Sequence, residues 1–199
     1  AGMVFPDPKP ISPNIALQTA PRVKRNSLGE VFVNFKDLRD DPIDGDQYFQ
    51  KIDTAGDPQW GEGVRLDPVD DIDFSARFTA NTLGGVSVIW ERGTFPDVDI
   101  FFQNLTSDGN YSLVEPLAIS NNLGYQFSPI LSGDEQNGMY AIYADQGSGS
   151  IDLMVQKLSA NFESEWGETG LVAMNGLDGD VNYTKTYRLG DQSLFHVWE

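Results

Sequence analysis

The pattern Asp-x-x-x-Gln at Asp99-Ile100-Phe101-Phe102-Gln103 recurs on either side at a constant interval. An equivalent stretch, Asp46-Gln47-Tyr48-Phe49-Gln50, lies 53 residues earlier, and Asp152-Leu153-Met154-Val155-Gln156 lies 53 residues later. Ten residues after each glutamine stands a large apolar residue, which is Trp60, Leu113 or Trp166. A spacing that is kept at two separate points of the motif indicates an internal repeat.

A hydrophobic run precedes each aspartate of the motif and ends in an aromatic residue. Four such runs occur, and their last residues are Phe35, Trp90, Tyr143 and Trp198, separated by 55, 53 and 55 residues. Repeats of roughly 40 to 55 residues built from short alternating strands are typical of β-propeller blades. The aromatic residues are predicted to pack as wedges between successive sheets.

Period-two alternation, bounded by Gly, Asn, Asp and Pro, predicts four strands in each unit. The sequence therefore predicts an all-β β-propeller segment of four-stranded antiparallel blades, with three complete blades and a partial blade at each end. The predicted boundaries are a partial blade at 1–19, blades at 20–67, 68–120 and 121–174, and a partial blade at 175–199. Residues 10–21 match residues 118–129, so the chain is expected to begin in the last strand of a preceding unit.

Partial units at both ends predict an incomplete ring. We therefore expect that the native protein continues past Glu199 or that another chain completes the ring. On either expectation, the first partner of this chain is the remainder of its own propeller or another protein chain.

Composition narrows the class of protein. The chain has 199 residues, 40% of them hydrophobic, with no cysteine and a net charge of −17. Such a charge repels phosphate backbones and anionic surfaces, so neither nucleic acid nor an anionic membrane surface is an expected partner. No apolar run approaches the ~20 residues that a membrane-spanning helix needs, so no membrane insertion is expected.

The repeating positions are predicted to be structural, because an active site is made once and has no reason to recur in every unit. An aspartate at a strand start can bind loop N–H groups, and a glutamine can bridge backbone groups of a neighbouring strand. No catalytic, cofactor or metal residue is assigned. The structural repeat positions are Asp46, Gln50, Trp60, Trp90, Asp99, Gln103, Tyr143, Asp152, Gln156, Trp166 and Trp198.

Few residues offer independent chemistry. His196 is the single histidine and lies inside a predicted strand, which disfavours a Ser-His-Asp triad or a His-ligated zinc site. Clusters of aspartate at 37–46 and 67–73 are expected to be solvated acidic loops, with Ca²⁺ binding as the alternative. No other cofactor is expected.

The cycle of proline, strand, glycine-rich turn, apolar strand ending in Trp, Asp-x-x-x-Gln motif and Trp-Gly resembles the repeats of secreted bacterial β-propeller proteins. Such proteins are common among the exported, cell-surface proteins of Bacteroidetes-type bacteria and are often type IX secretion substrates. The resemblance implies an extracellular or cell-surface location. The connection from Ile52 to Gly61 also resembles, loosely, the structural Asp-box turn of sialidase-type propellers.

Two functions remain open from the sequence. The first is a non-catalytic scaffold or binding segment of a larger secreted or cell-surface propeller protein. The alternative is a carbohydrate-active enzyme, sialidase-like or a five-bladed glycosidase, with carboxylates near the propeller axis and a glycan as its partner. The near-ring of Arg22, Arg77 and Lys185 at comparable first-strand positions, with Pro129 in the remaining unit, favours the enzyme.

Overall fold

The structure is a computed structural model that describes residues 8–68, 73–134, 137–147, 149–177, 184–188 and 194–198, the last two segments by their backbone only. The described residues form strands, turns and loops, with no helix among them. The chain divides into two compact units, Ala1–Pro68 and Val69–Glu199.

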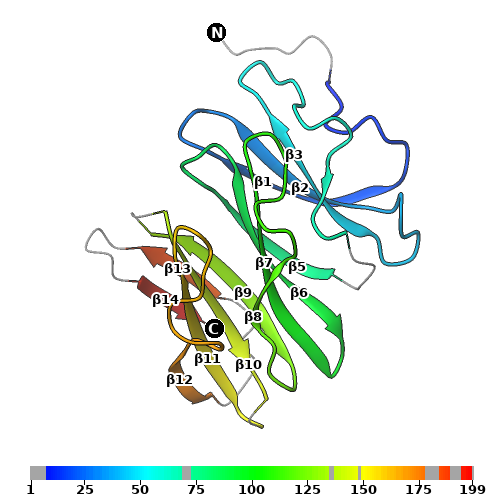
Figure 1. Ribbon diagram of the computed structural model, residues 1–199. Coiled ribbons are helices and arrows are strands. Elements are labelled where there is room, and N and C mark those ends of the chain that lie inside the picture. The colour runs from blue at the N-terminus through cyan, green and yellow to red at the C-terminus, as the bar shows by residue number, and fades with distance from the viewer. Residues whose placement is uncertain are drawn as a thin grey trace. The chain divides into compact units, whose positions relative to one another are not determined.

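Unit 1 holds one antiparallel sheet of four strands in sequence order. The strands are β1 (Gln18–Arg25), β2 (Val31–Asp37), β3 (Asp46–Ile52) and β4 (Val64–Arg65), and they run from dark blue to cyan in Figure 1. The predicted number of four antiparallel strands is confirmed for this unit. β2 is buried along most of its length, which explains its nearly continuous apolar sequence.

The expectation of an outer strand before β1 is wrong, because residues 8–17 form no strand. Pro10 and Pro13 lack the backbone N–H that a ladder needs, which disfavours strand pairing of this segment. It packs on the sheet instead. Ile11 contacts the buried cluster of Val33, Phe35 and Tyr48, and the Ser12 hydroxyl donates to the Glu62 carbonyl oxygen at 3.1 Å.

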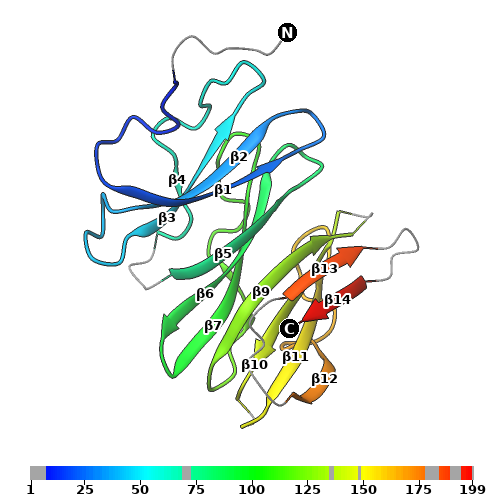
Figure 2. The same cartoon turned by 180° about the vertical axis from the view of Figure 1, so that it is seen from behind.

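Unit 2 holds two further four-stranded antiparallel sheets and a hairpin (Figures 1 and 2). The first sheet contains β5 (Asp73–Ala80), β6 (Val86–Thr94), β7 (Asp97–Leu105) and β8 (Leu117–Ser120). The second contains β9 (Gln126–Gly133), β10 (Met139–Asp145), β11 (Ile151–Leu158) and β12 (Leu171–Leu177), and β13 (Thr184–Arg188) pairs with β14 (Leu194–Trp198). The side chains of Lys185, His196 and Trp198 lie outside the described part of the chain.

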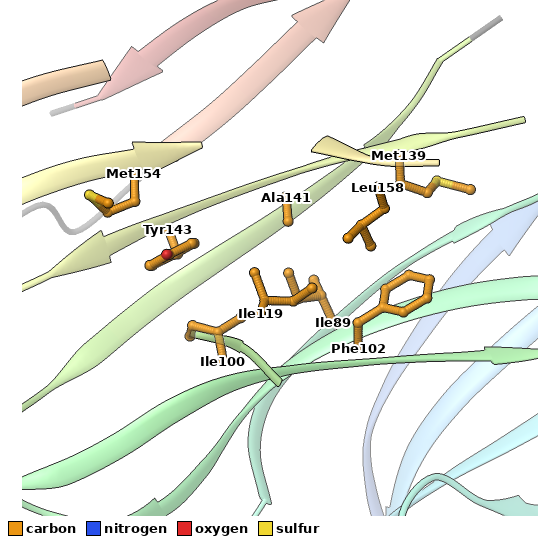
Figure 3. Packing of buried hydrophobic residues seen from close by; sticks show 9 residues of the cluster. All are labelled: Ile89, Ile100, Phe102, Ile119, Met139, Ala141, Tyr143, Met154 and Leu158. Carbon is orange, nitrogen blue, oxygen red and sulfur yellow. The ribbon is translucent and has the colours of Figure 1, made fainter. Parts of the chain in front are cut away.

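A hydrophobic core joins the two four-stranded sheets of unit 2 face to face (Figure 3). Side chains at alternate positions of a strand point to the same face, so each sheet presents a row to the other. The first sheet contributes Ile89, Ile100, Phe102 and Ile119, and the second contributes Met139, Ala141, Tyr143, Met154 and Leu158. Tyr143 is the predicted wedge here, and its hydroxyl donates to the Thr169 carbonyl oxygen at 2.8 Å.

The first strand of each four-stranded sheet carries a β-bulge near its start, where two residues oppose one on the second strand. In β9 the bulge holds Ser128, with φ 54°, and Pro129, and it falls opposite Tyr143. Ile130 is therefore the residue in register with Arg22, Arg77 and Lys185, and the assignment of Pro129 to that position is wrong. A proline is tolerated in a bulge because no ladder N–H is required there.

Candidate functional site

The motif glutamines make the same backbone bonds in three sheets. Each Oε1 accepts from the N–H of the next residue and from the N–H ten residues on, and each Nε2 donates to a carbonyl oxygen in the same following loop. The Nε2 bonds run from Gln50 to Gly61 at 2.9 Å, from Gln103 to Leu113 at 3.0 Å and from Gln156 to Gly167 at 2.7 Å. These buried side chains fasten the loop after the third strand to the strand itself.

The motif aspartates, in contrast, differ from sheet to sheet. Asp46 accepts from the Arg65 guanidinium at 2.7 Å, and Asp152 accepts from the Gly176 N–H at 2.9 Å. The Oδ1 atom of Asp99 is buried and accepts no hydrogen bond. Asp46 also has a buried oxygen, Oδ2, without a hydrogen-bond partner, but its Oδ1 is paired with Arg65.

Asp99 is also electrostatically distinct. Burial, reinforced by the nearby charge of Asp97 and then of Asp145, raises the pKa of the Asp99 carboxyl to about 6. Arg92, its partner across the β6–β7 ladder, opposes this rise without cancelling it. The Arg92 guanidinium carbon lies 3.4 Å from the centroid of the Phe101 ring, so Arg92 also makes a cation–π contact with that ring.

Asp97 and Asp99 occupy alternate positions of β7. They therefore point to the same side of the strand, with their backbone positions about 7 Å apart. Asp97 is exposed, and its Oδ1 accepts weakly from the Gly124 N–H at 3.4 Å. One half-buried acid with a raised pKa thus lies beside one exposed carboxylate.

The segment 121–125 forms the wall next to these acids. The Val98 N–H donates to the Gly124 carbonyl oxygen at 3.2 Å, and the Gln146 N–H donates to the Tyr125 carbonyl oxygen at 2.9 Å. A Cβ at Gly147 would lie 2.5 Å from the Leu123 carbonyl oxygen, so this close approach requires glycine. The segment is consequently held on both sides by backbone contacts.

The segment also borders a cleft of about 300 Å³, which is lined by Asn122, Leu123, Asp145, Gly147, Asp152, Met154 and Val172. Asp145 is buried there and accepts from Gln126 Nε2 at 3.2 Å, Asn122 Nδ2 at 3.1 Å and the Gly147 N–H at 2.7 Å. With its acceptors engaged, Asp145 organises the cleft rather than offering a reactive carboxylate.

The equivalent region of unit 1 is neutralised by arginine. Burial alone would raise the pKa of the Asp37 carboxyl, but hydrogen bonds and charge from Arg39 outweigh it and lower that pKa. The Arg39 guanidinium donates to Asp37 at 2.6 Å, and Gln18 Nε2 donates to the same carboxylate at 3.0 Å. Asp37 and Asp46 each accept from an arginine. Burial nevertheless raises the pKa of the Asp46 carboxyl, against the charge and hydrogen bond of Arg65, so Asp46 resembles Asp99 in part.

The tryptophan side chains at the other repeat positions, where the structure describes them, make ring contacts or are buried. The Trp60 ring lies 5.7 Å from that of Phe32, and the Trp166 ring lies 5.8 Å from that of Tyr140. Trp90 is fully buried and donates from Nε1 to Asp73 at 2.8 Å. The middle sheet has Ser87 and Leu113 where the others have these aromatic pairs.

Among the residues that the structure describes, no group of three or more histidine or acidic side chains is arranged to hold a metal ion. Nor does the described part of the chain contain a helix long and apolar enough to cross a membrane.

Comparison with solved structures identifies the architecture. No family model and no curated protein matches the chain. An α-L-arabinanase from Penicillium chrysogenum, complexed with arabinobiose, matches 94% of the chain with a TM-score of 0.61 and 13% identity. The chain has a β-propeller fold.

Two other matches support the same fold. An endo-arabinase from Bacteroides thetaiotaomicron matches 90% of this propeller chain with a TM-score of 0.54 and 11% identity. A polysaccharide lyase of family PL25, an ulvan lyase, matches 85% with a TM-score of 0.57 and 12% identity. The propeller chain spans 60% of the Penicillium protein, 69% of the Bacteroides protein and 46% of the lyase. At these identities the likeness concerns the fold.

Proposed function

We propose that this chain is a portion of a carbohydrate-active β-propeller, and that the Asp99 end of unit 2 acts on a glycan. The observation that carries the proposal is the pairing of Asp99, with its buried unpartnered Oδ1 and raised pKa, with the exposed Asp97 two residues away. Glycoside hydrolysis commonly uses two carboxyl groups whose surroundings separate their protonation states. The likeness to propellers that act on arabinan and ulvan supports the same class.

In this proposal Asp99 is the general acid. Its carboxyl gives a proton to the glycosidic oxygen as the bond from that oxygen to the anomeric carbon breaks. A water molecule attacks the anomeric carbon, and Asp97 accepts the proton that the water loses. Proton exchange with solvent then restores both carboxyl groups, so the net reaction adds one water across the bond.

The stereochemical outcome is a separate test of the pair. The two carboxyl groups of an inverting glycosidase are about 6.5–9.5 Å apart, which leaves room for a water, whereas a retaining pair is closer. Proton NMR of the first-formed anomer would distinguish the two.

Release of reducing ends from arabinan tests the proposal. We expect the chain to cleave the polymer with a rate that falls as the pH rises through about 6, because Asp99 must be protonated. Asp99→Asn should lower the rate at least ~100-fold. Asp108→Asn changes an exposed acid in the loop that follows the same strand and should leave the rate unchanged.

A second candidate is a glycan-binding or scaffold segment without turnover. The observation in its favour is that Asp46, Asp99 and Asp152 recur at one position of the repeat, as structural residues do. Binding of arabinan without release of reducing ends would support this candidate over hydrolysis. Under either function we expect a location at the cell surface or outside the cell, which fractionation of the source cells would test.

A further inference from the structure

Three aromatic side chains form a continuous group at the same end of unit 2. The rings of Tyr125 and Phe127 are stacked with centroids 4.8 Å apart and planes 10° apart. Phe95, in the turn between β6 and β7, meets the Tyr125 ring edge-on at 5.8 Å. We call these three residues the aromatic platform.

The platform is exposed and fixed at once. The Phe95 residue is 74% exposed, whereas Phe32, Phe49 and Phe102 are fully buried. Its neighbours are anchored through the backbone, since the Tyr125 carbonyl oxygen accepts from Gln146 and the Ser128 N–H donates to the buried Glu91 carboxylate at 2.8 Å. An exposed ring resting on an anchored base suits ligand contact, because little ordering is needed on binding.

The ring geometry favours stacking of a ligand on one ring face over enclosure of a ligand between rings. Cages that hold quaternary ammonium groups enclose a cation between several ring faces. Tyr125 and Phe127 are stacked on each other at 4.8 Å, so there is no space between them for such a group. The exposed Phe95 ring instead offers a surface on which the apolar C–H face of a sugar ring can lie.

The charges around the platform select a neutral sugar. Burial, and then the charge of the Glu91 carboxylate, raises the pKa of the Tyr125 hydroxyl. The acids Asp97 and Asp99 follow Phe95 by two and four residues. The β-strand that precedes Phe95 supplies one cation, Arg92, which lies over the Phe101 ring. A uronic acid or sulfated sugar would meet net repulsion here, in a chain whose net charge is already −17.

We propose that the aromatic platform is a glycan subsite that stacks a neutral sugar ring on Phe95 and discriminates against anionic sugars. The choice of a glycan as the ligand rests on the proposed function. The inference adds a binding residue, Phe95, and a preference for neutral sugars. The carboxylates that repel an anionic sugar remain available to accept hydrogen bonds from the hydroxyl groups of a neutral one.

Affinity electrophoresis of the 199-residue chain through gels containing arabinan or ulvan tests this subsite. Arabinan is the neutral probe, and ulvan, with glucuronic acid and sulfated rhamnose units, is the anionic probe. We expect arabinan to retard the chain and ulvan to leave its mobility unchanged at low ionic strength. Phe95→Ala should weaken arabinan binding about 10-fold.

A matched control separates loss of the subsite from loss of folding. Leu83, 76% exposed, lies in the turn between β5 and β6, at the other end of the same sheet. Leu83→Ala should bind arabinan as the parent chain does, and both variants should keep the parent melting temperature. Equal arabinan binding by Phe95→Ala and the parent would overturn the subsite while leaving the proposed function standing.

Preference for the anionic polymer would overturn the charge argument. Retardation by ulvan but not by arabinan would be that result, and the reducing-end assay would then be repeated with ulvan. Failure to bind either polymer, together with binding of tetramethylammonium measured by calorimetry, would overturn the sugar subsite and indicate a cation as the ligand. Failure to bind any of the three probes would overturn both this inference and the proposed function.

Discussion

The Phe162 ring packs against the Phe102 ring, 5.2 Å between centroids, from a backbone position with φ 64°. The same turn position holds Gly56 and Gly109 in the other two sheets, with φ 83° and 80°. Left-handed backbone costs a non-glycine residue roughly 1–2 kcal/mol. The contact between the two sheets of unit 2 must therefore offset a local strain.

This competition predicts an unusual order of stabilities. Phe162→Ala should lose about 2 kcal/mol, because it removes the ring and keeps the strain. Phe162→Gly should lose about 1 kcal/mol less than Phe162→Ala, since glycine tolerates this backbone. Urea unfolding of both variants would measure the difference. An alanine variant more stable than the glycine variant would contradict the strain argument.

The hydrogen bonds from each motif glutamine to the loop after the third strand, which we call the glutamine clamp, predict a large loss of stability when one glutamine is replaced. Gln50→Leu should destabilise the chain by roughly 2–4 kcal/mol, because the Trp60 N–H and the Gly61 carbonyl oxygen lose their partner. Gln59→Leu, nine residues later and exposed, is the control and should cost under ~0.5 kcal/mol. Denaturant midpoints would measure both, and similar shifts would show that the clamp adds little.

The Asp37–Arg39 pair predicts that removing Arg39 lowers the stability of the chain by an amount that depends on pH. Arg39→Met leaves the fully buried Asp37 carboxylate without its cation and should cost roughly 3–5 kcal/mol at pH 7. In the parent chain the lowered pKa of Asp37 contributes stability above its unfolded pKa of about 4, and this stability is lost as the pH falls. The difference between parent and variant should therefore narrow from pH 7 to pH 3.

A second variant separates charge from packing in this pair. The double variant Asp37→Asn with Arg39→Met should recover part of the loss at pH 7, because no unpaired charge remains. Unfolding measured across the pH range would show this. A loss in the single variant that does not change with pH would attribute the effect to the Arg39 side chain packing on Tyr48.

Asp99 predicts the opposite pH dependence. Its folded pKa of about 6 lies above the unfolded value of about 4, so the parent chain loses stability as the pH rises from about 4 to about 6. Asp99→Asn cannot ionise and should gain melting temperature relative to the parent on going from pH 4 to pH 8. Calorimetric melting curves at both values would test this, and a constant difference would show that Asp99 titrates normally.

The repeat spacing was sufficient to predict the fold. Strand positions are set by alternation and by turn glycines, and both recur with the period that the Asp-x-x-x-Gln motif reveals. The bulge of the first strand recurs in all three four-stranded sheets. The spacing of the aromatic residues, 55 and then 53, leads from Arg22 through Arg77 to Ile130, so the assignment of Pro129 was an alignment error of one residue.

The candidate site was less accessible to prediction. Asp46, Asp99 and Asp152 are identical in sequence, and they differ only in their surroundings. Arg65 and Gly176, which partner Asp46 and Asp152, come from the following strand or its neighbourhood, far from the motif in sequence. The lack of an equivalent bond to Asp99 Oδ1 became visible only with the packing. The exposed Phe95 turn carried no periodic signal at all.

Hydrogen exchange with an arabino-oligosaccharide tests the central claim most directly, because it reports where a glycan contacts the chain without requiring turnover. We predict protection of the segments 95–99 and 121–125, which carry the aromatic platform and the Asp99 pair, and unchanged exchange at the turns 81–85 and 107–112 at the other end of the sheet. Protection confined to those turns, or none at a concentration that saturates binding in the gel assay, would contradict the account.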